Sequence, residues 1–437
     1  MLARPPILTT KKESIEAIML GSNEEAKPYL DKIHAEYYYW DKVKYLAPDG
    51  TFNGKMLWFA AKMHRRLNYR YIKFGNYTFC YTITDTILEL LHELDMNIGG
   101  NLSSESIIPE QNKNQYLVSS IMEEAIASSQ MEGASTTRKV AKEMLRKNEK
   151  PKNKGQQMIA NNYQTIHYIK DHAYDDFSIE RLQEIHRLMT KNTLDNPQEE
   201  GLLRTNDNIM VVDGVTGSVA HVPPAFAELD RLLHDLETFF NKPGAPFIHP
   251  VIKGIIIHFL LAYIHPFSDG NGRTSRSLFY WYLIKQGYWM IEYLSVSRII
   301  YKSKQQYEKA FLYTEYDEND LTYFILYNLR TMKNAFQELK KYLKRKTEET
   351  KNVSLVMQRQ GIGLRESQVL KIFMDTPQTM LTIKEVENQL AVSNHMARIY
   401  LTHLVGLGFL DEIAINKRKS GFVKSSRFEE LLNVAFT

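Results

Sequence analysis

The sequence predicts a mainly helical protein with one small β-hairpin near its middle and a C-terminal domain of mixed helix and strand. Three observations support this fold class. Apolar residues recur at helical spacing through most of the chain. Residues 208–222 instead have the pattern of two short strands joined by a turn. After about Gly361 the pattern changes again, and short helices precede two strands.

The length of 437 residues favours about three domains, at roughly 150 residues each. We expect an N-terminal helical domain over residues 1–114, a central helical domain over 115–302, a helical linker over 303–355 and a C-terminal domain over 356–437. Apolar residues make up 43% of the chain and charged residues 24%. This composition excludes a disordered chain, because it supplies enough apolar side chains for buried cores.

The net charge and the cysteine content limit which binding partners and which cellular compartment the sequence indicates. The 55 Lys and Arg residues exceed the 51 Asp and Glu residues by only 4, which does not by itself indicate a nucleic-acid partner. The single cysteine, Cys80, excludes an internal disulfide and favours a reducing compartment. The N-terminus lacks the apolar stretch of a signal peptide, and Gly254–Ile264 is shorter than the ~20 residues of a membrane span. We therefore expect a cytoplasmic protein without a membrane partner, and Cys80 in a core.

Helical patterns dominate the N-terminal domain and the expected linker. Thr86–Met96 carries apolar residues at helical spacing, and two glycines follow it as a stop signal. The aromatic run from Tyr37 to Trp40 favours packing in a core over a ligand platform. The lysine-rich run over Glu338–Lys351 favours a solvated helix.

The predicted hairpin consists of Asn208–Val212 and Ser218–Val222 on either side of a glycine-bearing turn. A lone hairpin is only marginally stable, so this one must pack on the helices. Its free edge can accept an extended peptide as an added strand. A purely structural hairpin explains the same pattern equally well.

The C-terminal domain resembles a winged helix. Its expected elements are listed in chain order: helices Glu366–Met374, Thr382–Leu390 and Asn394–Val405, then strands Phe409–Ile415 and Gly421–Lys424. Asn394–Leu404 is the candidate recognition helix, and the basic turn at Lys417, Arg418 and Lys419 is the candidate wing. From Lys351 to Thr437, 11 Lys and Arg against 8 Asp and Glu leave +3, a small charge for a DNA reader. The domain is thus a candidate for binding either DNA or a protein.

The most informative segment runs from His265 to Arg276, between two predicted buried helices. Gly270 and Gly272 flank Asn271, which leaves backbone amides unshielded at the start of the second helix, where an anion is favoured. Such a turn is a candidate phosphate cradle.

Charged side chains surround this cradle. Arg273 and Arg276 lie on one face of the first helical turn, where the helix dipole disfavours cations, so a bound anion is indicated. Asp269 is placed to hold Mg²⁺ against phosphate oxygens, and His265 is placed as a general base. The combination indicates nucleotidyl or phosphoryl transfer.

This segment resembles the signature of the Fic family, His-x-Phe-x-Asp/Glu-Gly-Asn-Gly-Arg-x-x-Arg, at every defining position, and the likeness extends upstream to the hairpin. The resemblance implies a helical Fic core with a hairpin flap. It also implies transfer of AMP from ATP to a Tyr, Thr or Ser hydroxyl of a target protein, and of the enzyme itself, with pyrophosphate released.

The resemblance also assigns roles to the individual residues. His265 takes the hydroxyl proton, and Asp269 holds Mg²⁺. The remaining residues bind phosphate or nucleoside: Gly270, Asn271, Gly272, Arg273, Arg276 and, at a less specific pattern, Tyr307. The target segment would align along the 208–222 flap by strand addition.

A second Fic motif, Ser/Thr-x-x-x-Glu-Gly/Asn, marks an inhibitory helix in many family members. Ser128, Glu132 and Gly133 match it. Ser128 and Glu132 share a helix face, and Gly133 suits a helix C-cap. By resemblance, Glu132 pairs with Arg276 and removes it from the γ-phosphate, so we expect an autoinhibited enzyme.

Two other functions remain open from the sequence. The same site can remove AMP from a modified protein if Glu132 orients a water molecule. Alternatively, the chain is a DNA-binding regulator whose Fic domain senses nucleotide. A homo-oligomer is a further candidate assembly.

Overall fold

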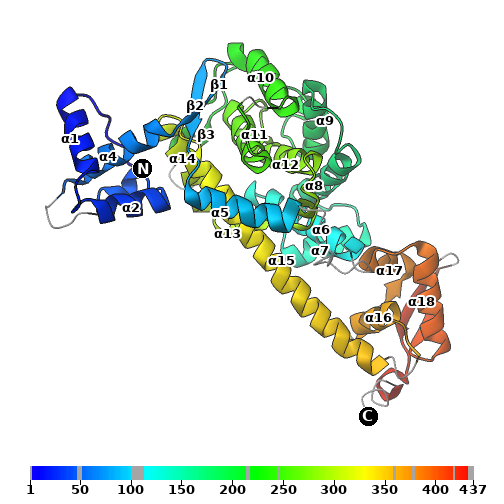
Figure 1. The fold of residues 1–437 in the computed structure, drawn as a ribbon. Helices are drawn as coiled ribbons and strands as arrows, with labels where there is room; N and C mark the ends of the chain where they lie inside the picture. Colours follow the sequence, from blue (N-terminus) through cyan, green and yellow to red (C-terminus); the bar gives the residue numbers. More distant parts are fainter. Residues whose placement is uncertain are drawn as a thin grey trace.

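The computed structural model describes residues 2–46, 52–99, 113–212, 217–243, 246–357, 361–375, 379–416 and 419–431. It confirms the mainly helical fold class. Figure 1 shows a main helical body, a small group of N-terminal helices on one side of it, and a C-terminal domain at the far end of one long helix.

The N-terminal region combines helices with a hairpin. Its elements are α1 (Lys11–Gly21), α2 (Lys27–Glu36), α3 (Trp40–Val43), α4 (Gly54–Leu67), β1 (Arg70–Phe74), β2 (Tyr77–Tyr81), α5 (Asp85–Leu94) and the π-helix η1 (Asp95–Gly99). The antiparallel β1–β2 hairpin corrects the prediction of a purely helical N-terminal domain. Gly75, with φ +56°, makes its tight turn. Cys80 in β2 is buried and unpaired, as expected, and Tyr37 and Tyr39 are buried in the core.

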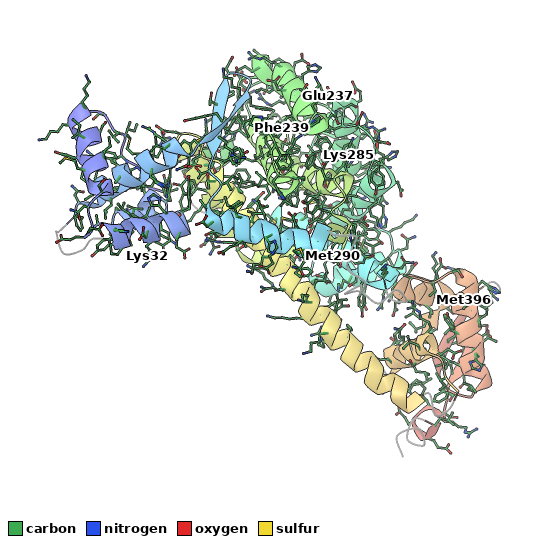
Figure 2. The ribbon with its side chains drawn as sticks, in the orientation of Figure 1. Lys32, Glu237, Phe239, Lys285, Met290 and Met396 are labelled. Carbon is green, nitrogen blue, oxygen red and sulfur yellow. The ribbon has the colours of Figure 1, made fainter. Side chains whose placement is uncertain are left out.

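The main body is built around α11 (Pro250–Ile264) and α12 (Asn271–Lys285). The elements that surround them are α6 (Lys113–Met131), α7 (Arg138–Lys147), α8 (Lys154–Asp171), α9 (Ile179–Thr190), η3 (Pro197–Glu199), η4 (Phe226–Glu228), α10 (Leu229–Asn241), η5 (Trp289–Tyr293) and α13 (Val296–Lys302). Nearly every side chain of α11 is buried, because the helix is apolar on all faces. Side chains fill the space between these helices, where Met290 is buried (Figure 2).

The predicted 208–222 hairpin is present but shorter than expected. Its strands are β3 (Val211–Val212) and β4 (Val219–His221), paired antiparallel with a register shift. Residues 213–216 of the expected turn lie outside the described residues.

Residues 303–355, expected as a linker, instead join the main body. They form α14 (Lys304–Tyr316) and most of α15 (Thr322–Met357). Buried side chains from Tyr307 to Leu343 belong to the same hydrophobic core as those of α11, α12 and the N-terminal helices. The linker interpretation fails because α14 and the first half of α15 each bury an apolar face. The other domain boundaries remain predictions.

The C-terminal domain has its own hydrophobic core, from Ile362 to Phe428. Its elements are α16 (Leu364–Asp375), β5 (Leu381–Thr382), α17 (Ile383–Leu390), α18 (Asn394–Gly406), β6 (Leu410–Asn416) and β7 (Lys419–Lys424). The sheet has the antiparallel order β5–β7–β6. The helices and the last two strands occur where the sequence predicts them, and β5 is additional. Lys417 and Arg418 of the expected wing lie outside the described residues, and the winged-helix assignment remains a prediction.

Within the described ranges, the structure contains no helix with the length and apolar content needed to cross a lipid bilayer. The apolar Gly254–Ile264 stretch lies inside the buried helix α11.

Candidate functional site

His265 lies at the point where α11 ends. Its backbone is left-handed (φ 49°), which turns the chain out of the helix. The ring nitrogen Nδ1 lies 3.3 Å from the carbonyl oxygen of Ala262. If Nδ1 carries the proton and donates to this carbonyl, Nε2 is left as the acceptor. Burial lowers the pKa of His265 to about 4, so the ring is a neutral base at physiological pH.

The turn that follows depends on glycine. Gly270 has φ +82°, and a Cβ there would lie 2.7 Å from a methyl carbon of Thr190 on α9. Asn271, the first residue of α12, braces the turn with its side chain, which accepts from the Phe267 amide at 3.0 Å and donates to the Phe267 carbonyl at 2.7 Å. The turn is therefore held rigidly between α11 and α12.

The N-terminus of α12 presents backbone amides without a side-chain cap. The Glu132 side chain, from the turn after α6, lies close to Gly272 in the first turn of α12, because a Cβ on Gly272 would collide with its carboxylate. The positive end of a helix dipole favours an anion here. A carboxylate thus already stands where a phosphate would be favoured.

Glu132 and Arg276 form an ion pair of 2.8 Å. Arg276 also donates from Nε to the Ser128 hydroxyl and from a terminal nitrogen to the Ser128 carbonyl, both at 3.0 Å. Burial opposes ionisation of Glu132, but Arg276 outweighs it and lowers the pKa of Glu132. The pair is therefore ionised at neutral pH.

Gly133 ends α6 in the expected manner. Its φ is +92°, its amide bonds to the Gln130 carbonyl at 3.2 Å, and the Ala134 amide bonds to the Ser129 carbonyl at 3.0 Å. This pair of bonds is a Schellman motif. The structure thus brings Ser128, Glu132 and Gly133 together with Arg276.

Arg273 is almost fully buried on the other side of the same helical turn. It donates to the Met189 carbonyl at 3.1 Å, and its Nε has no partner within the described part of the chain. Asp269 is exposed beside the turn, and one of its oxygens accepts from the Gly270 amide at 2.5 Å. Of the three cradle amides that the sequence predicts, that of Gly270 is therefore engaged locally.

These groups lie around an open cavity of about 270 Å³. His265, Glu132 and Arg276 line its base, residues of the 208–222 hairpin line one wall, and α14 lines another. Tyr307 on α14 lines the cavity too, and its hydroxyl lies 2.9 Å from Nε2 of the buried His258. Six of the predicted site residues line this cavity: Glu132, His265, Asn271, Gly272, Arg276 and Tyr307. The other five are not among its lining residues: Ser128, Gly133, Asp269, Gly270 and Arg273.

His221 connects the 208–222 hairpin to the helices that line the cavity. One ring nitrogen of His221 lies 2.8 Å from the Tyr263 carbonyl on α11, and the other lies 2.8 Å from the Glu315 carboxylate on α14. Strand β4 is therefore tied to both helices that frame the cavity.

Sequence reasoning missed two residues that position the loop. His186 on α9 stacks flat on Phe267, with ring centroids 3.7 Å apart, and its Nε2 lies 2.8 Å from the Asp269 carbonyl. Arg204 is buried and donates to the His265 carbonyl at 3.2 Å and to the Pro224 carbonyl at 2.5 Å. Both act from distant parts of the sequence, so no local motif signals them.

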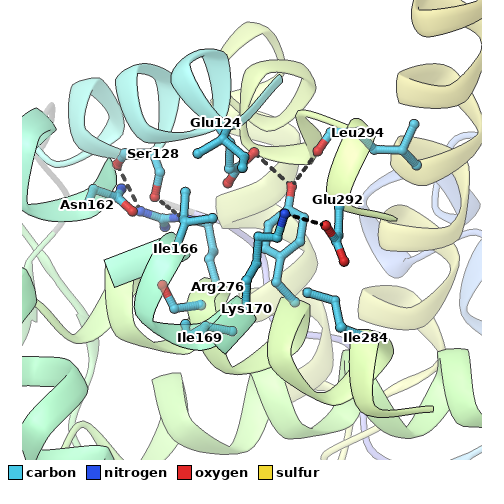
Figure 3. Close-up of a pocket in the computed structure, with 13 residues that line it drawn as sticks. Glu124, Ser128, Asn162, Ile166, Ile169, Lys170, Arg276, Ile284, Glu292 and Leu294 are labelled. Atoms are coloured by element: carbon cyan, nitrogen blue, oxygen red, sulfur yellow. Dashed lines mark hydrogen bonds and ion pairs between the residues drawn. The ribbon is translucent and has the colours of Figure 1, made fainter. Parts of the chain in front are cut away.

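A second, smaller pocket of about 20 Å³ lies beside Arg276 (Figure 3). Glu124 and Ser128 of α6 face it from one side, and the Lys170–Glu292 ion pair faces it from another. The inhibitory-motif residues therefore lie between the larger cavity and the smaller one.

The fold and the site define a helical protein with an uncapped helix N-terminus beside a neutral histidine. Residues 176–283 match the model of the Fic/DOC family, so the chain carries a Fic/DOC family domain.

Relatives with the name protein adenylyltransferase Fic match this region. The one from Aedes aegypti is 37% identical over 114 residues, 26% of this chain and 21% of the relative. The one from Drosophila yakuba is 36% identical over 113 residues, with the same shares. The chain thus aligns with about a fifth of the length of these relatives.

Solved structures show the same fold. A Fic family protein from Desulfovibrio desulfuricans is similar with a TM-score of 0.52 and 19% identity, over 79% of this chain and 98% of that one. A Fic-1 fragment from C. elegans is similar with a TM-score of 0.50 and 18% identity, over 76% of this chain and 88% of that one.

Proposed function

We propose that this protein is an autoinhibited protein adenylyltransferase, which moves AMP from ATP to a hydroxyl side chain of a target protein and of itself. The relatives that share the Fic domain carry this activity in their names. The observation that carries the proposal is the Glu132 carboxylate, ion-paired to Arg276 at the N-terminus of α12, in the cavity that His265 lines. A charged pair occupies the place where the nucleotide phosphates belong.

ATP binds with its phosphates over the first turn of α12. The amides of Asn271 and Gly272 face the diphosphate, and Gly270 leaves room for its approach. Arg273 has an unpartnered buried Nε, which supports a role toward an anion. Arg276 binds the outer phosphates once Glu132 releases it. Tyr307 contacts the nucleoside at the α14 wall.

The residues present are compatible with Mg²⁺. No group of three or more His, Cys, Asp or Glu side chains capable of holding a metal is found among the described residues. A magnesium ion shared with phosphates needs only one or two carboxylates, and Asp269 is exposed beside the cradle. When bound, Mg²⁺ neutralises charge on the α- and β-phosphates.

His265 supplies the proton chemistry. Its Nε2 takes the proton of the target hydroxyl as that oxygen attacks the α-phosphorus. A bond forms between this oxygen and phosphorus, the bond from phosphorus to the bridging oxygen of the β-phosphate breaks, and pyrophosphate leaves. The low pKa of His265 keeps the ring in its basic form.

The 208–222 hairpin receives the target as an added strand. Val212 and Val219 of the hairpin are about half exposed, next to the cavity mouth. An extended segment that pairs with the free edge would carry its hydroxyl residue toward His265. The same geometry admits a segment of a second copy of this chain.

Removal of AMP from a modified protein is the second candidate function. The Glu132 side chain is 30% exposed at the cavity. A carboxylate in that position can orient a water molecule for attack on the phosphorus of the AMP ester. An AMP-modified protein supplied to wild type and to Glu132→Gln tests this: faster AMP release by wild type supports removal.

The deciding experiment for transfer uses three forms of the full chain: wild type, Glu132→Gly and Glu132→Gly with His265→Ala. Each is incubated with ATP and Mg²⁺ and a cell lysate, and intact mass measures AMP added to the protein itself or to lysate proteins. We expect weak transfer by wild type and strong transfer by Glu132→Gly. The loss of His265 should remove transfer, because general-base catalysis contributes about 10²- to 10⁴-fold.

Two results would contradict the proposal. Equal transfer by wild type and Glu132→Gly would refute autoinhibition through Glu132. Persistent transfer without His265 would refute its role as the base.

A further inference from the structure

Three polar side chains are spaced four residues apart along α6 and the turn that follows it: Glu124, Ser128 and, directly after the last helical residue Met131, Glu132. The motif accounts for the last two. Glu124 is 5% exposed, and it faces the smaller pocket from α6 (Figure 3). A carboxylate this deep in a core requires a structural explanation, because burial penalises its charge.

Four donors surround the Glu124 carboxylate. One oxygen accepts from the Tyr280 hydroxyl at 2.7 Å, from the Ser297 amide at 3.0 Å and from the Ser295 hydroxyl at 3.3 Å. The other accepts from the Ser297 hydroxyl. Since a carboxylate offers about four lone-pair positions, its capacity is filled.

The partners of Glu124 belong to the elements that build the site. Tyr280 lies on α12, one turn beyond Arg276, and its hydroxyl also accepts from the Val296 amide at 2.9 Å. Ser297 lies in the first turn of α13, which leads directly into α14 and the cavity wall. Glu124 therefore joins α6, α12 and α13 at one point.

Helix α6 is thus attached to α12 at two places. Glu132 meets Arg276 at one, and Glu124 meets Tyr280 at the other, with Ser128 between them bonded to Arg276. The two glutamates are eight residues apart, or about 12 Å along the helix. Fixing α6 at Glu124 fixes where Glu132 can reach.

We propose that Glu124 is a positioning residue of the inhibitory helix, which holds α6 in the register at which Glu132 reaches Arg276. This inference rests on the proposed function, since it assigns a second determinant to the same inhibition. Without the Glu124 anchor, α6 can shift on α12 and α13, and Arg276 becomes available to the nucleotide.

The test compares Glu124→Ala with the isosteric Glu124→Gln, each alone and combined with Glu132→Gly, in the full chain. We expect Glu124→Ala to raise AMP transfer by about five-fold or more. Glu124→Gln should keep transfer low, because the amide can donate to the Ser297 hydroxyl while its oxygen still accepts from the Ser297 amide and Tyr280. In the Glu132→Gly background, neither substitution should raise transfer further.

Glu292→Gln is the matched control. Glu292 lines the same smaller pocket and pairs with Lys170 at 2.8 Å, away from α6. We expect it to leave transfer at the wild-type level. If Glu124→Ala does not fold, Ser297→Ala removes one donor of the same anchor and should raise transfer in the same direction.

Three outcomes overturn the inference. The first is active Glu132→Gly alongside unchanged transfer in both Glu124→Ala and Ser297→Ala. The second is an equal change of transfer by Glu124→Ala with and without Glu132, which shows a general effect on the fold. The third is Glu132→Gly no more active than wild type, which refutes the proposed autoinhibition and this inference with it.

Discussion

Two glutamates, Glu132 and Glu124, make the contacts with α12 at the two ends of the α6–α12 contact, and their surroundings differ. Glu132 is 30% exposed at the open cavity and pairs with the cation of Arg276. Glu124 is 5% exposed beside the smaller pocket and is bound by hydroxyl and amide donors. The Glu132 end therefore faces the larger cavity, whereas Glu124 is buried.

This difference gives the two glutamates different roles. Glu132 can release Arg276, whereas Glu124 holds α6 in place. Glu132 is partly exposed, so an anion that enters the cavity can replace it as the partner of the buried Arg276 cation. A buried carboxylate with filled hydrogen bonds is costly to disturb, because its donors are left without partners. A helix with one contact of each kind can release a side chain without leaving its place.

The largest expected effect is a loss of AMP transfer when Arg276, the partner of Glu132, is replaced. In the Glu132→Gly background, Arg276→Ala should lower AMP transfer by about 10²-fold or more, because a preorganised phosphate ligand is lost. Tyr280→Phe, at the Glu124 end, should leave transfer in that background within about two-fold. Transfer rates measured side by side check the contrast, and a comparable loss in both variants would break it.

The next effect is on stability at the Glu124 end. Glu124→Ala should cost about 3 kcal/mol, since a buried polar network loses its acceptor, and should lower the Tm by about 3 °C in a chain of this length. Glu132→Gly should lower it by about 2 °C or less. Thermal unfolding followed by circular dichroism measures both. If Glu132→Gly lowered the Tm more than Glu124→Ala does, Glu132 rather than Glu124 would be the residue that stabilises the contact.

The two ends should also respond oppositely to pH. Arg276 lowers the pKa of Glu132, so its contribution is full above about pH 4.5 and is lost in acid as Glu132 protonates. Burial raises the pKa of Glu124, so its ionisation costs stability as the pH rises from about 4.5.

Relative to wild type, Glu132→Gln should therefore be least stable near neutral pH and approach wild type in acid. Glu124→Gln should gain on wild type as the pH rises. Differences in Tm from wild type at several pH values between about 2.5 and 8 test this, and parallel curves for the two variants would contradict it.

The smallest expected effect belongs to Ser128, between the two ends. Ser128→Ala removes one acceptor of Arg276, but the Ser128 carbonyl and Glu132 still hold that arginine. We expect AMP transfer to rise by about two- to three-fold. A rise as large as that of Glu132→Gly would show that the hydroxyl, rather than the ion pair, holds Arg276.

The sequence predicts the site well where the chemistry is local. His265, Gly270, Gly272 and Arg276 follow one another within one turn and one helix, so their spacing alone brings them together. The hairpin is also recognisable, since its strands and turn are contiguous. Glu132 comes within reach because a second short motif marks it.

Other residues that contact each other from distant parts of the sequence belong to no local motif, so the sequence does not predict them. Glu124 and Ser297 meet in the core although 173 residues separate them, and His186 reaches a carbonyl 83 residues away. In sequence, each is an ordinary polar residue on a helix. The β1–β2 hairpin and the packed α14 are missed for a related reason: their apolar faces are defined by neighbours from other parts of the chain.

The long helix α15 connects the main body to the C-terminal domain. Its 36 residues span about 54 Å. Its described side chains reach into the main core as far as Leu343, and the C-terminal domain follows the end of the helix (Figure 1). That domain touches the main body again through Asn388 of α17, which donates to the Arg146 carbonyl on α7 at 2.8 Å. Arg138 of α7 in turn pairs with Glu123 of α6. Polar contacts therefore connect the C-terminal domain through α7 to α6, the helix that ends directly before Glu132.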